Sequence, residues 1–273
     1  MIGFIVDLDF VWGFQARVVG LSKTSPSFTY PPPTTFLGAL AESIAKKHAL
    51  GESVGAKLLP LFGEKLLALA IKPLNCFPIK YSDLNKVIAV KVTSGVHYPD
   101  PSNLARSFDS PARGKTVVVS HHGAPSIRWA VVFKDDVLTV EGHEIKLEEG
   151  CFWGIHRLGS KESLVSILDV KRVEEPETKE GNIVVKFSFP VQNGVEPLEE
   201  LSGRWSYEAY VNPRSIKYSL KGNIFTGYMS GENLIPYRIP ILSTAESPKF
   251  WVKVSPPMVA YKLEEDFVIG WRG

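Results

Sequence analysis

Residues 27–43 read SFTYPPPTTFLGALAES, and this proline-led stretch decides where the first helix of the chain begins. Three consecutive prolines hold the backbone extended and rigid. Directly after them, apolar residues recur at helical spacing over residues 36–44. Lys46, Lys47 and His48 follow, where positive charge suits the carboxyl end of a helix. The pattern predicts a helix over residues 34–50 with Thr34 or Thr35 as its N-cap.

This helix has two features that concern ligands. Its first N–H groups have no partner within the helix, so they form a potential anion site. Gly38 is unfavourable in a helical turn, so we expect another segment or molecule to approach its backbone.

Strand patterns surround the helix. Ile2–Val19 reads as a long first strand bent at Gly13, and further strands are predicted over Lys65–Ile71, as a pair within Ile127–Val140, and over Leu164–Val173. After the acidic run EEPETKEGN (174–182), short β-like segments recur to the end of the sequence. The order predicts an α+β N-terminal domain that carries a long insertion, followed by a smaller β-rich domain.

Composition excludes several classes of protein. The chain has 273 residues, of which 44% are hydrophobic and 22% charged, enough for a sizeable core and too apolar for disorder. Prolines and glycines interrupt the longest uncharged runs, so no segment approaches the roughly 20 apolar residues of a spanning helix, and Asp7 and Asp9 interrupt the start where a signal peptide is basic and then apolar. We expect neither a membrane protein nor a secreted one.

Cysteine and histidine spacing argues against metal chemistry. Cys76 and Cys151 are the only cysteines, which excludes a zinc knuckle or disulfide scaffold and favours buried thiols in a reducing cytoplasm. The six histidines form no dense metal-binding spacing. We therefore predict no metal and no cofactor.

Charge is balanced in total but uneven along the chain. The 31 Lys and Arg residues nearly cancel the 29 Asp and Glu residues. Lys86 to Arg128 holds six basic residues against two acidic ones, whereas Val173 to Glu200 holds two against seven. One face could therefore attract a polyanion while the rest stays soluble.

The segment GIHRLGSKES (154–163) nearly matches a phosphate-binding P-loop. Ser160 separates Gly159 from Lys161, and a strand pattern follows where a P-loop opens a helix, so the segment does not indicate an NTPase. Gly159 still permits close backbone approach, and the neighbouring side chains could donate to phosphate or bases. The alternative is a β-turn with solvated charges.

Three blocks in order give the chain a resemblance to a known family. They are FQARVV (14–19), YPPPTTFLGALAESIA (30–45) and HRLGSKESLVSI (156–167). With the β-rich tail, they make the chain resemble the CRISPR-associated Cas-five family, RAMP-superfamily subunits of Cascade-type antiviral complexes, and most of all its archaeal subtype I-A form.

The resemblance implies a fold and partners. It implies an RRM-like (ferredoxin-like) palm over residues 1–175, an inserted β-hairpin thumb at about 72–128, and a β-rich C-terminal domain over 176–273. Such members grip the 5′ handle of the guide RNA (crRNA) and cap a filament of Cas-seven subunits. The large Cas-eight subunit lies beside them, and target DNA near the PAM-proximal end is a further expected partner.

The charge pattern and the resemblance together nominate residues for RNA binding. Tyr30, Tyr98 and Phe108 are additional candidates for base stacking, and packing in the core is an equally open alternative for each of them. The nominated residues are Arg17, Lys23, Thr34, Thr35, Arg106, Arg113, Lys115, His121, His122, Arg128, His156, Arg157, Ser160 and Lys161.

Two other functions stay open. One relative in the family is an endoribonuclease that processes precursor guide RNA, but this chain has LGSKES where that subtype has LGCREF, so we expect no catalysis. His121, His122, Tyr98 and Lys115 are the residues that would serve such cleavage. The third reading is a β-rich protein-interaction module that binds no RNA.

Overall fold

The computed structural model describes residues 1–16, 26–84, 87–88, 91–93, 96–98, 108–109, 112–216, 233–242 and 246–273. Within these ranges the chain is mostly β-sheet with few helices, an α+β fold. The helices are α1 (Pro33–Lys47), α2 (Gly51–Ala56) and α3 (Leu58–Lys65), with 3-10 turns η1 (Glu149–Cys151) and η2 (Pro213–Ser215). The strands of the first half are β1 (Ile2–Phe10), β2 (Gly13–Phe14), β3 (Leu66–Pro73), β4 (Cys76–Leu84), β5 (Val87–Ile88), β6 (Lys91–Thr93), β7 (Val96–Tyr98), β8 (Phe108–Asp109), β9 (Ala112–Ser120), β10 (Ser126–Phe133), β11 (Val137–Val140) and β12 (His143–Lys146). Those of the second half are β13 (Val165–Glu174), β14 (Thr178–Lys179), β15 (Gly181–Val185), β16 (Phe189–Pro190), β17 (Val195–Ser202), β18 (Arg204–Val211), β19 (Leu234–Ile241), β20 (Lys249–Val254), β21 (Met258–Leu263) and β22 (Asp266–Trp271).

A four-stranded sheet with the order β13-β1-β10-β3 forms the centre of the molecule. All three pairings are antiparallel, so β1 and β3 run parallel and are joined through the helices. Alternate residues of β1, such as Phe4 and Val6, face α1, where Phe36 stacks on Trp129 with ring centroids 4.7 Å apart. The alternation of β1 and the periodicity of α1 therefore meet in one core.

Helix α1 begins one residue earlier than the sequence predicts. Its N-cap is Pro32 and its first residue is Pro33, so Thr34 and Thr35 lie inside the first turn and the predicted threonine cap is wrong. Proline suits this position because its fixed φ is helical and its missing N–H needs no partner. The helix ends at Lys47, close to the predicted end.

The first strand bends where the sequence predicts it. β1 ends at Phe10, and Gly13 opens β2 with a φ of +147° that side-chain-bearing residues rarely adopt. A Cβ on Gly13 would lie 2.1 Å from the carbonyl oxygen of Thr116 on β9. Gly13 thus lets the backbone turn and pair closely with β9.

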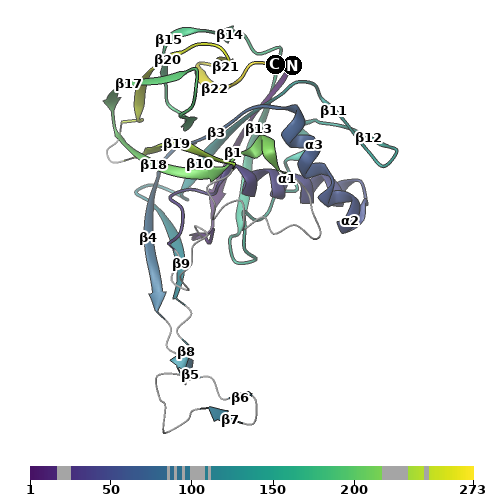
Figure 1. Ribbon diagram of the computed structural model, residues 1–273, viewed down its shortest axis with the longest axis vertical. Coiled ribbons are helices and arrows are strands. Elements are labelled where there is room, and N and C mark those ends of the chain that lie inside the picture. Colours follow the sequence, from purple (N-terminus) through teal and green to yellow (C-terminus); the bar gives the residue numbers. More distant parts are fainter. Residues whose placement is uncertain are drawn as a thin grey trace.

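Strands β4 and β9 form a long antiparallel ribbon, the arm, between β3 and β10 (Figure 1). At its base, one face of the ribbon packs against the body through Cys76, Thr116 and Val118, all buried. The opposite face exposes Ile79 and Tyr81. The arm begins right after β3 and returns into β10, so the central sheet fixes its root.

The C-terminal strands form three small sheets with orders β14-β21-β22, β15-β20-β17 and β16-β19-β18. Tyr210 and Tyr237 of the last sheet belong to the same core as α1. Tyr261 and Val268 instead cover the opposite face of the central sheet, against Ile5. The central sheet is therefore buried on both faces along part of its length.

Glu208 on β18 joins three parts of the chain. Its carboxylate accepts hydrogen bonds from the Thr29 backbone at 2.9 Å and the Thr29 hydroxyl at 2.6 Å, and from Tyr210 at 2.7 Å. Lys80 of the arm forms an ion pair with it at 3.1 Å. Because a buried carboxylate needs such partners, this cluster fixes the arm and the loop before α1 to the C-terminal sheet.

Several sequence predictions differ from the structure. Helices α2 and α3 were not expected, because their short segments contain Gly51, Gly55 and Pro60 and lack a long apolar stripe. β11 follows β10, as expected from Ile127–Val140, but it pairs with β12. The part of the predicted β-like segments that falls in residues 217–232 lies outside the described residues.

Other sequence predictions hold. Both cysteines are buried and unbridged, as predicted. No helix in the described ranges is long and apolar enough to cross a membrane.

Alanine substitutions at two glycines should change the free energy of unfolding in opposite directions. Gly13→Ala should lower the free energy of unfolding by at least about 2 kcal/mol, because a Cβ there collides with the Thr116 carbonyl in a strained backbone. Gly38→Ala should raise it by about 0.5–1 kcal/mol, because alanine is the better helix former. Within the described parts of the chain nothing lies within 4 Å of that added Cβ, contrary to the expectation that a segment of the chain approaches Gly38.

Urea unfolding of both variants measures these changes. Equal destabilisation by the two substitutions would contradict the assigned roles.

Candidate nucleic-acid interface

Residues 154–163, the glycine loop, form a closed turn immediately before β13. The Leu158 N–H donates to the Ser163 carbonyl at 2.9 Å, and the Ser163 N–H donates to the Ser160 carbonyl at 3.0 Å. Gly159 has a φ of +96°, so its lack of a Cβ is what permits the turn. A strand follows the loop, as the sequence predicts, so the helix of a P-loop is missing here.

The glycine loop lies against residues 11–16. The Trp12 indole donates to the Glu162 carbonyl at 2.6 Å, and the Gln15 N–H donates to the Ser163 hydroxyl at 3.0 Å. Ser163 is completely buried, and its hydroxyl oxygen lies 3.0 Å from the Oγ of Ser160. The loop is therefore held by the chain that continues from β1.

The start of α1 reaches the same place. A Cβ on Gly159 would lie 3.3 Å from the Gln15 carbonyl and 3.6 Å from Thr35 Cγ2. Thr34 and Thr35 are both half-buried. The fold thus brings together the glycine loop, Gln15 and the first turn of α1, which are three separate blocks of the sequence.

Arg157 is tied to the protein itself. Its guanidinium donates to both carboxylate oxygens of Glu42 on α1, at 3.1 Å and 2.9 Å, and Glu42 also pairs with Lys46 at 2.8 Å. Burial by itself would raise the pKa of Glu42, but hydrogen bonds from Lys46 and Arg157 outweigh burial and lower it. Arg157 thus fastens the glycine loop to α1.

Other nominated side chains of the loop face solvent. Lys161 and His156 are exposed, and His156 Nδ1 lies 3.2 Å from the Gly154 carbonyl. Ser160 is half-buried. Lys161 and His156 are the loop groups that a ligand could reach without breaking an ion pair.

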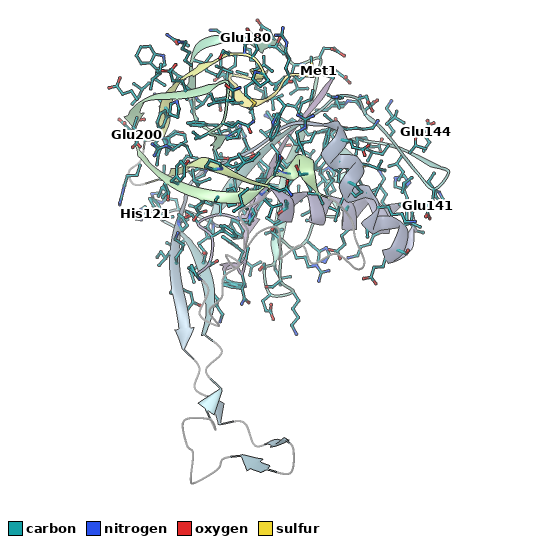
Figure 2. The ribbon with its side chains drawn as sticks, viewed as in Figure 1. Met1, His121, Glu141, Glu144, Glu180 and Glu200 are labelled. Atoms are coloured by element: carbon teal, nitrogen blue, oxygen red, sulfur yellow. The ribbon has the colours of Figure 1, made fainter. Side chains whose placement is uncertain are left out.

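The adjacent histidines lie where the arm joins the body (Figure 2). β9 ends at Ser120, so His121 and His122 occupy the turn before β10. Both are exposed, and the His121 ring packs edge-on against Phe77 with centroids 4.9 Å apart. On β9 itself, Lys115 is half-buried opposite Tyr81.

Arg128 lies on the central sheet and not in the arm. It forms two hydrogen bonds with Asp7 of β1, at 2.6 Å and 2.7 Å, and the bond to Asp7 raises the pKa of Arg128 despite partial burial. Because its charge is already neutralised, Arg128 is a poor phosphate ligand, contrary to the expectation from its position in the basic segment. Lys72, at the start of the predicted thumb, is likewise buried and paired with Asp266.

Some nominated residues lie outside the described residues. These are Arg17, Lys23 and Arg106, together with the side chains of Arg113, Tyr98 and Phe108. Tyr30, in contrast, is fully buried in the main core, where burial raises the pKa of its hydroxyl well above the usual value. Tyr30 therefore packs the core, and stacking on RNA is excluded for it.

Residues 11–16 lie between the glycine loop and the arm. Gly13 and Phe14 pair with Val117 and Thr116 of β9, while Trp12 and Gln15 hold the glycine loop. On the other side of β1, the Phe10 N–H donates to the Pro125 carbonyl in the turn that follows His122. The loop and the arm base therefore meet at one end of the central sheet.

Sequence reasoning missed the residues that hold this arrangement. Trp12, Gln15 and Glu42 carry no motif of their own, and their roles depend on partners more than 100 positions away. In the described ranges, no three His, Cys, Asp or Glu side chains gather as a metal site would require.

No protein-family model matches the chain, but comparisons with known proteins find similar ones. A curated protein named "CRISPR-associated protein Cas5 2", from Saccharolobus solfataricus, is 25% identical over 269 residues, which is 96% of this chain and 92% of that protein. A solved structure titled "Crystal structure of a CRISPR protein from Archaeoglobus fulgidus" is 44% identical, covers 100% of both chains and has a TM-score of 0.74.

The Glu42–Arg157 contact predicts a pH effect on stability. A carboxyl whose pKa is lowered in the folded state stabilises the protein above its unfolded-state pKa, and this contribution is lost as the pH falls through the folded-state pKa. Wild type should therefore be more stable than Glu42→Gln at pH 6, and the difference should shrink as the pH falls below the ordinary glutamate range of about 4.

Chemical unfolding of both proteins between pH 6 and 3 tests this prediction. The matched control is Glu144→Gln, because Glu144 is exposed, and this variant should follow wild type throughout. A difference between wild type and Glu42→Gln that stays constant with pH would contradict the assignment.

Proposed function

The chain belongs to the Cas5 family of CRISPR-associated proteins, and from this membership we propose that it is a guide-RNA-binding subunit of a type I Cascade complex. In this role it grips the 5′ handle of the guide RNA and caps a filament of Cas-seven subunits, with the Cas-eight subunit beside it. We assign it to the archaeal subtype I-A form. The observation that carries the proposal is the meeting of the glycine loop and the arm base across residues 11–16.

Strand order supports a ferredoxin-like palm. In chain order the central strands are β1, β3, β10 and β13, and their spatial order is β13-β1-β10-β3. A crossover through α1 joins β1 to β3. We interpret this order as a βαββαβ arrangement whose second helix is replaced by the β11–β12 hairpin and η1. In this proposal, the arm is the thumb.

Charge on the central sheet argues against RNA binding there. The face of β1 turned away from α1 carries Asp7, which holds Arg128, and Asp9, which accepts a hydrogen bond from Ser126. RRM domains commonly stack bases on aromatic residues of the sheet, but here Asp7 is already ion-paired and the carboxylate of Asp9 repels phosphate. The end of the sheet, where the glycine loop meets the arm base, is the better RNA surface.

Single-stranded RNA fits the chemistry of that end. Lys161 and His156 are exposed donors on a turn whose shape is fixed by the buried Ser163. Tyr81 and His121 add exposed rings on the arm. Phosphate contacts from cations and stacking of splayed bases are the two ways in which proteins hold a single strand.

Lys161 provides a test of RNA binding. Lys161→Ala should weaken binding of a 5′-handle RNA up to about fivefold, since an exposed ionic contact contributes up to about 1 kcal/mol. The slope of log affinity against log salt should fall by about 0.7, the value for one phosphate contact on a single strand. Fluorescence anisotropy over a salt series measures both.

The matched control is Lys134→Ala. Lys134 is also an exposed lysine, but it follows the opposite end of β10 and should leave affinity and slope unchanged. An equal loss in both variants would show that the RNA is bound through general charge and not by the glycine loop. Absence of any binding by wild type would favour a protein-interaction module without RNA.

We further propose that the chain does not cut RNA. The proposal rests on LGSKES in place of the LGCREF wording of the nuclease subtype. Purified protein should leave a repeat RNA containing the 5′ handle intact over hours in EDTA, as resolved on a denaturing gel. Cleavage that disappears in His121→Ala or His122→Ala would instead establish an endoribonuclease.

A further inference from the structure

The segment that leads into the glycine loop lies along helix α1. The Ser43 hydroxyl of α1 donates to the Cys151 carbonyl at 2.6 Å, and a Cβ on Gly154 would collide with the same hydroxyl. At the other end of the segment, a Cβ on Gly159 would lie 3.6 Å from Thr35 Cγ2. Thr35 and Ser43 are roughly 12 Å apart along the helix, at about 1.5 Å per residue. The segment therefore follows α1 from its second half back to its first turn.

Trp153 is an exposed ring on a fixed backbone within this segment. Its neighbour Phe152 is completely buried in the main core, and Gly154 on its other side is held against Ser43. Trp153 is 52% exposed, the largest exposed fraction among the six tryptophans of the chain. The fold thus holds the backbone in place and leaves the indole accessible to a ligand.

Exposed residues recur from Trp153 to the glycine turn and form one row, the exposed row. Its members are Trp153, His156, Gly159 and Lys161. Each of the first three directly follows a residue buried in the main core, namely Phe152, Ile155 and Leu158. His156 and Lys161 are the exposed donors of the glycine loop, so Trp153 lies where a strand bound to that loop would continue along α1.

Charge beside the exposed row is balanced. On α1 and on residues 147–163, cations and carboxylates occur in equal number: Lys46, Lys47, Arg157 and Lys161 against Glu42, Glu148, Glu149 and Glu162. Glu148 is paired with Lys47. Glu42 is shared by Lys46 and Arg157. A ligand at the indole therefore gains little from net charge and must be held by the ring itself.

The surroundings of the indole favour a nucleobase over a second protein. A tryptophan that dominates a protein interface is surrounded by further contacts that exclude water. Yet no other large hydrophobic side chain is exposed on the described residues of α1, α2, α3, β11, β12 or the glycine loop. Leu164, the next one along the chain, lies beside Val11 instead. A base, in contrast, needs only one ring on which to stack.

We propose that Trp153 stacks on an unpaired base of the RNA strand that the glycine loop holds, so that the strand continues past the loop along α1. This assignment rests on the proposed function, because that function places the strand on the glycine loop. The ligand group is the flat face of a base, and every base offers such a face.

Fluorescence anisotropy of labelled 5′-handle RNA with the full chain tests the assignment. Trp153→Ala should weaken binding between about fivefold and about a hundredfold, the range for the loss of one base–aromatic stack. Trp153→Phe should recover most of that affinity, because it keeps an aromatic ring. The slope of log affinity against log salt should stay unchanged in both variants, unlike in Lys161→Ala, since no phosphate contact is removed.

A series of handle RNAs that each contain one abasic nucleotide identifies the base. At one position, loss of the base should weaken binding to wild type about as much as Trp153→Ala does. Combining that RNA with Trp153→Ala should then cause no further loss, because both changes remove the same stack. A purely structural role of Trp153 would give additive losses at every position.

Trp251→Ala is the matched control. It removes another exposed tryptophan, 39% exposed, from β20, whose sheet lies at the opposite end of the molecule from the arm (Figure 1). This control should bind handle RNA as wild type does, and thermal unfolding should show all three variants folded.

The outcomes separate this proposal from the proposed function. If wild type binds handle RNA but Trp153→Ala binds it equally well, the stacking assignment is overturned and the proposed function stands. A loss that Trp153→Phe does not reduce, or one that is additive with every abasic position, overturns it as well. Unchanged RNA affinity with loss of a Cas-seven or Cas-eight subunit in pull-downs would make Trp153 a protein contact. If wild type binds no handle RNA, the proposed function itself fails, and the stacking assignment fails with it.

Discussion

The backbone of residues 11–16 is the constraint on which the rest of the structure depends. Directly after β1, this segment pairs with β9 through Gly13 and Phe14 and holds the glycine loop through Trp12 and Gln15. The position of Gly13 leaves no room for a side chain, and the Gln15 N–H donates to the buried hydroxyl of Ser163. The segment therefore cannot shift without breaking contacts with β9 and with the glycine loop. The segment therefore fixes the positions of the arm and of the glycine loop relative to the central sheet, although the two are far apart in sequence.

Many cations of this chain are engaged in ion pairs within the protein. The sequence contains a basic segment, yet cations of that segment, of the arm and of the glycine loop are used inside the protein: Arg128 of the basic segment holds Asp7, Lys80 of the arm holds Glu208 and Arg157 of the glycine loop holds Glu42. A cation that is paired with a carboxylate adds little net charge to the field outside the protein. A count of Lys and Arg along the chain thus overestimates the charge available to a polyanion. The cations that matter for binding are those that remain exposed, of which Lys161 is an example in the described part of the chain.

Local patterns predicted much of this fold, and long-range partners account for what they missed. Neighbouring residues alone determine three features, which the sequence therefore predicted: the periodicity of residues 36–44, the bend at Gly13 and the strand after the glycine loop. The threonine cap was wrong because Pro33 itself starts the helix. The β11–β12 hairpin was missed because a strand pattern does not specify its partner. For the same reason the anchoring roles of Gln15 and Glu42 could not be predicted from composition or spacing.

The central claim is that the glycine loop and the arm hold one strand of guide RNA between them. Its most direct test is to crosslink the full chain to 5′-handle RNA containing 4-thiouridine and to map the crosslinked peptides by mass spectrometry. The account predicts crosslinks both in residues 154–163 and in β4 or β9, from nucleotides of the same handle. Crosslinks confined to the sheet β15-β20-β17, or to the glycine loop without the arm, would contradict it.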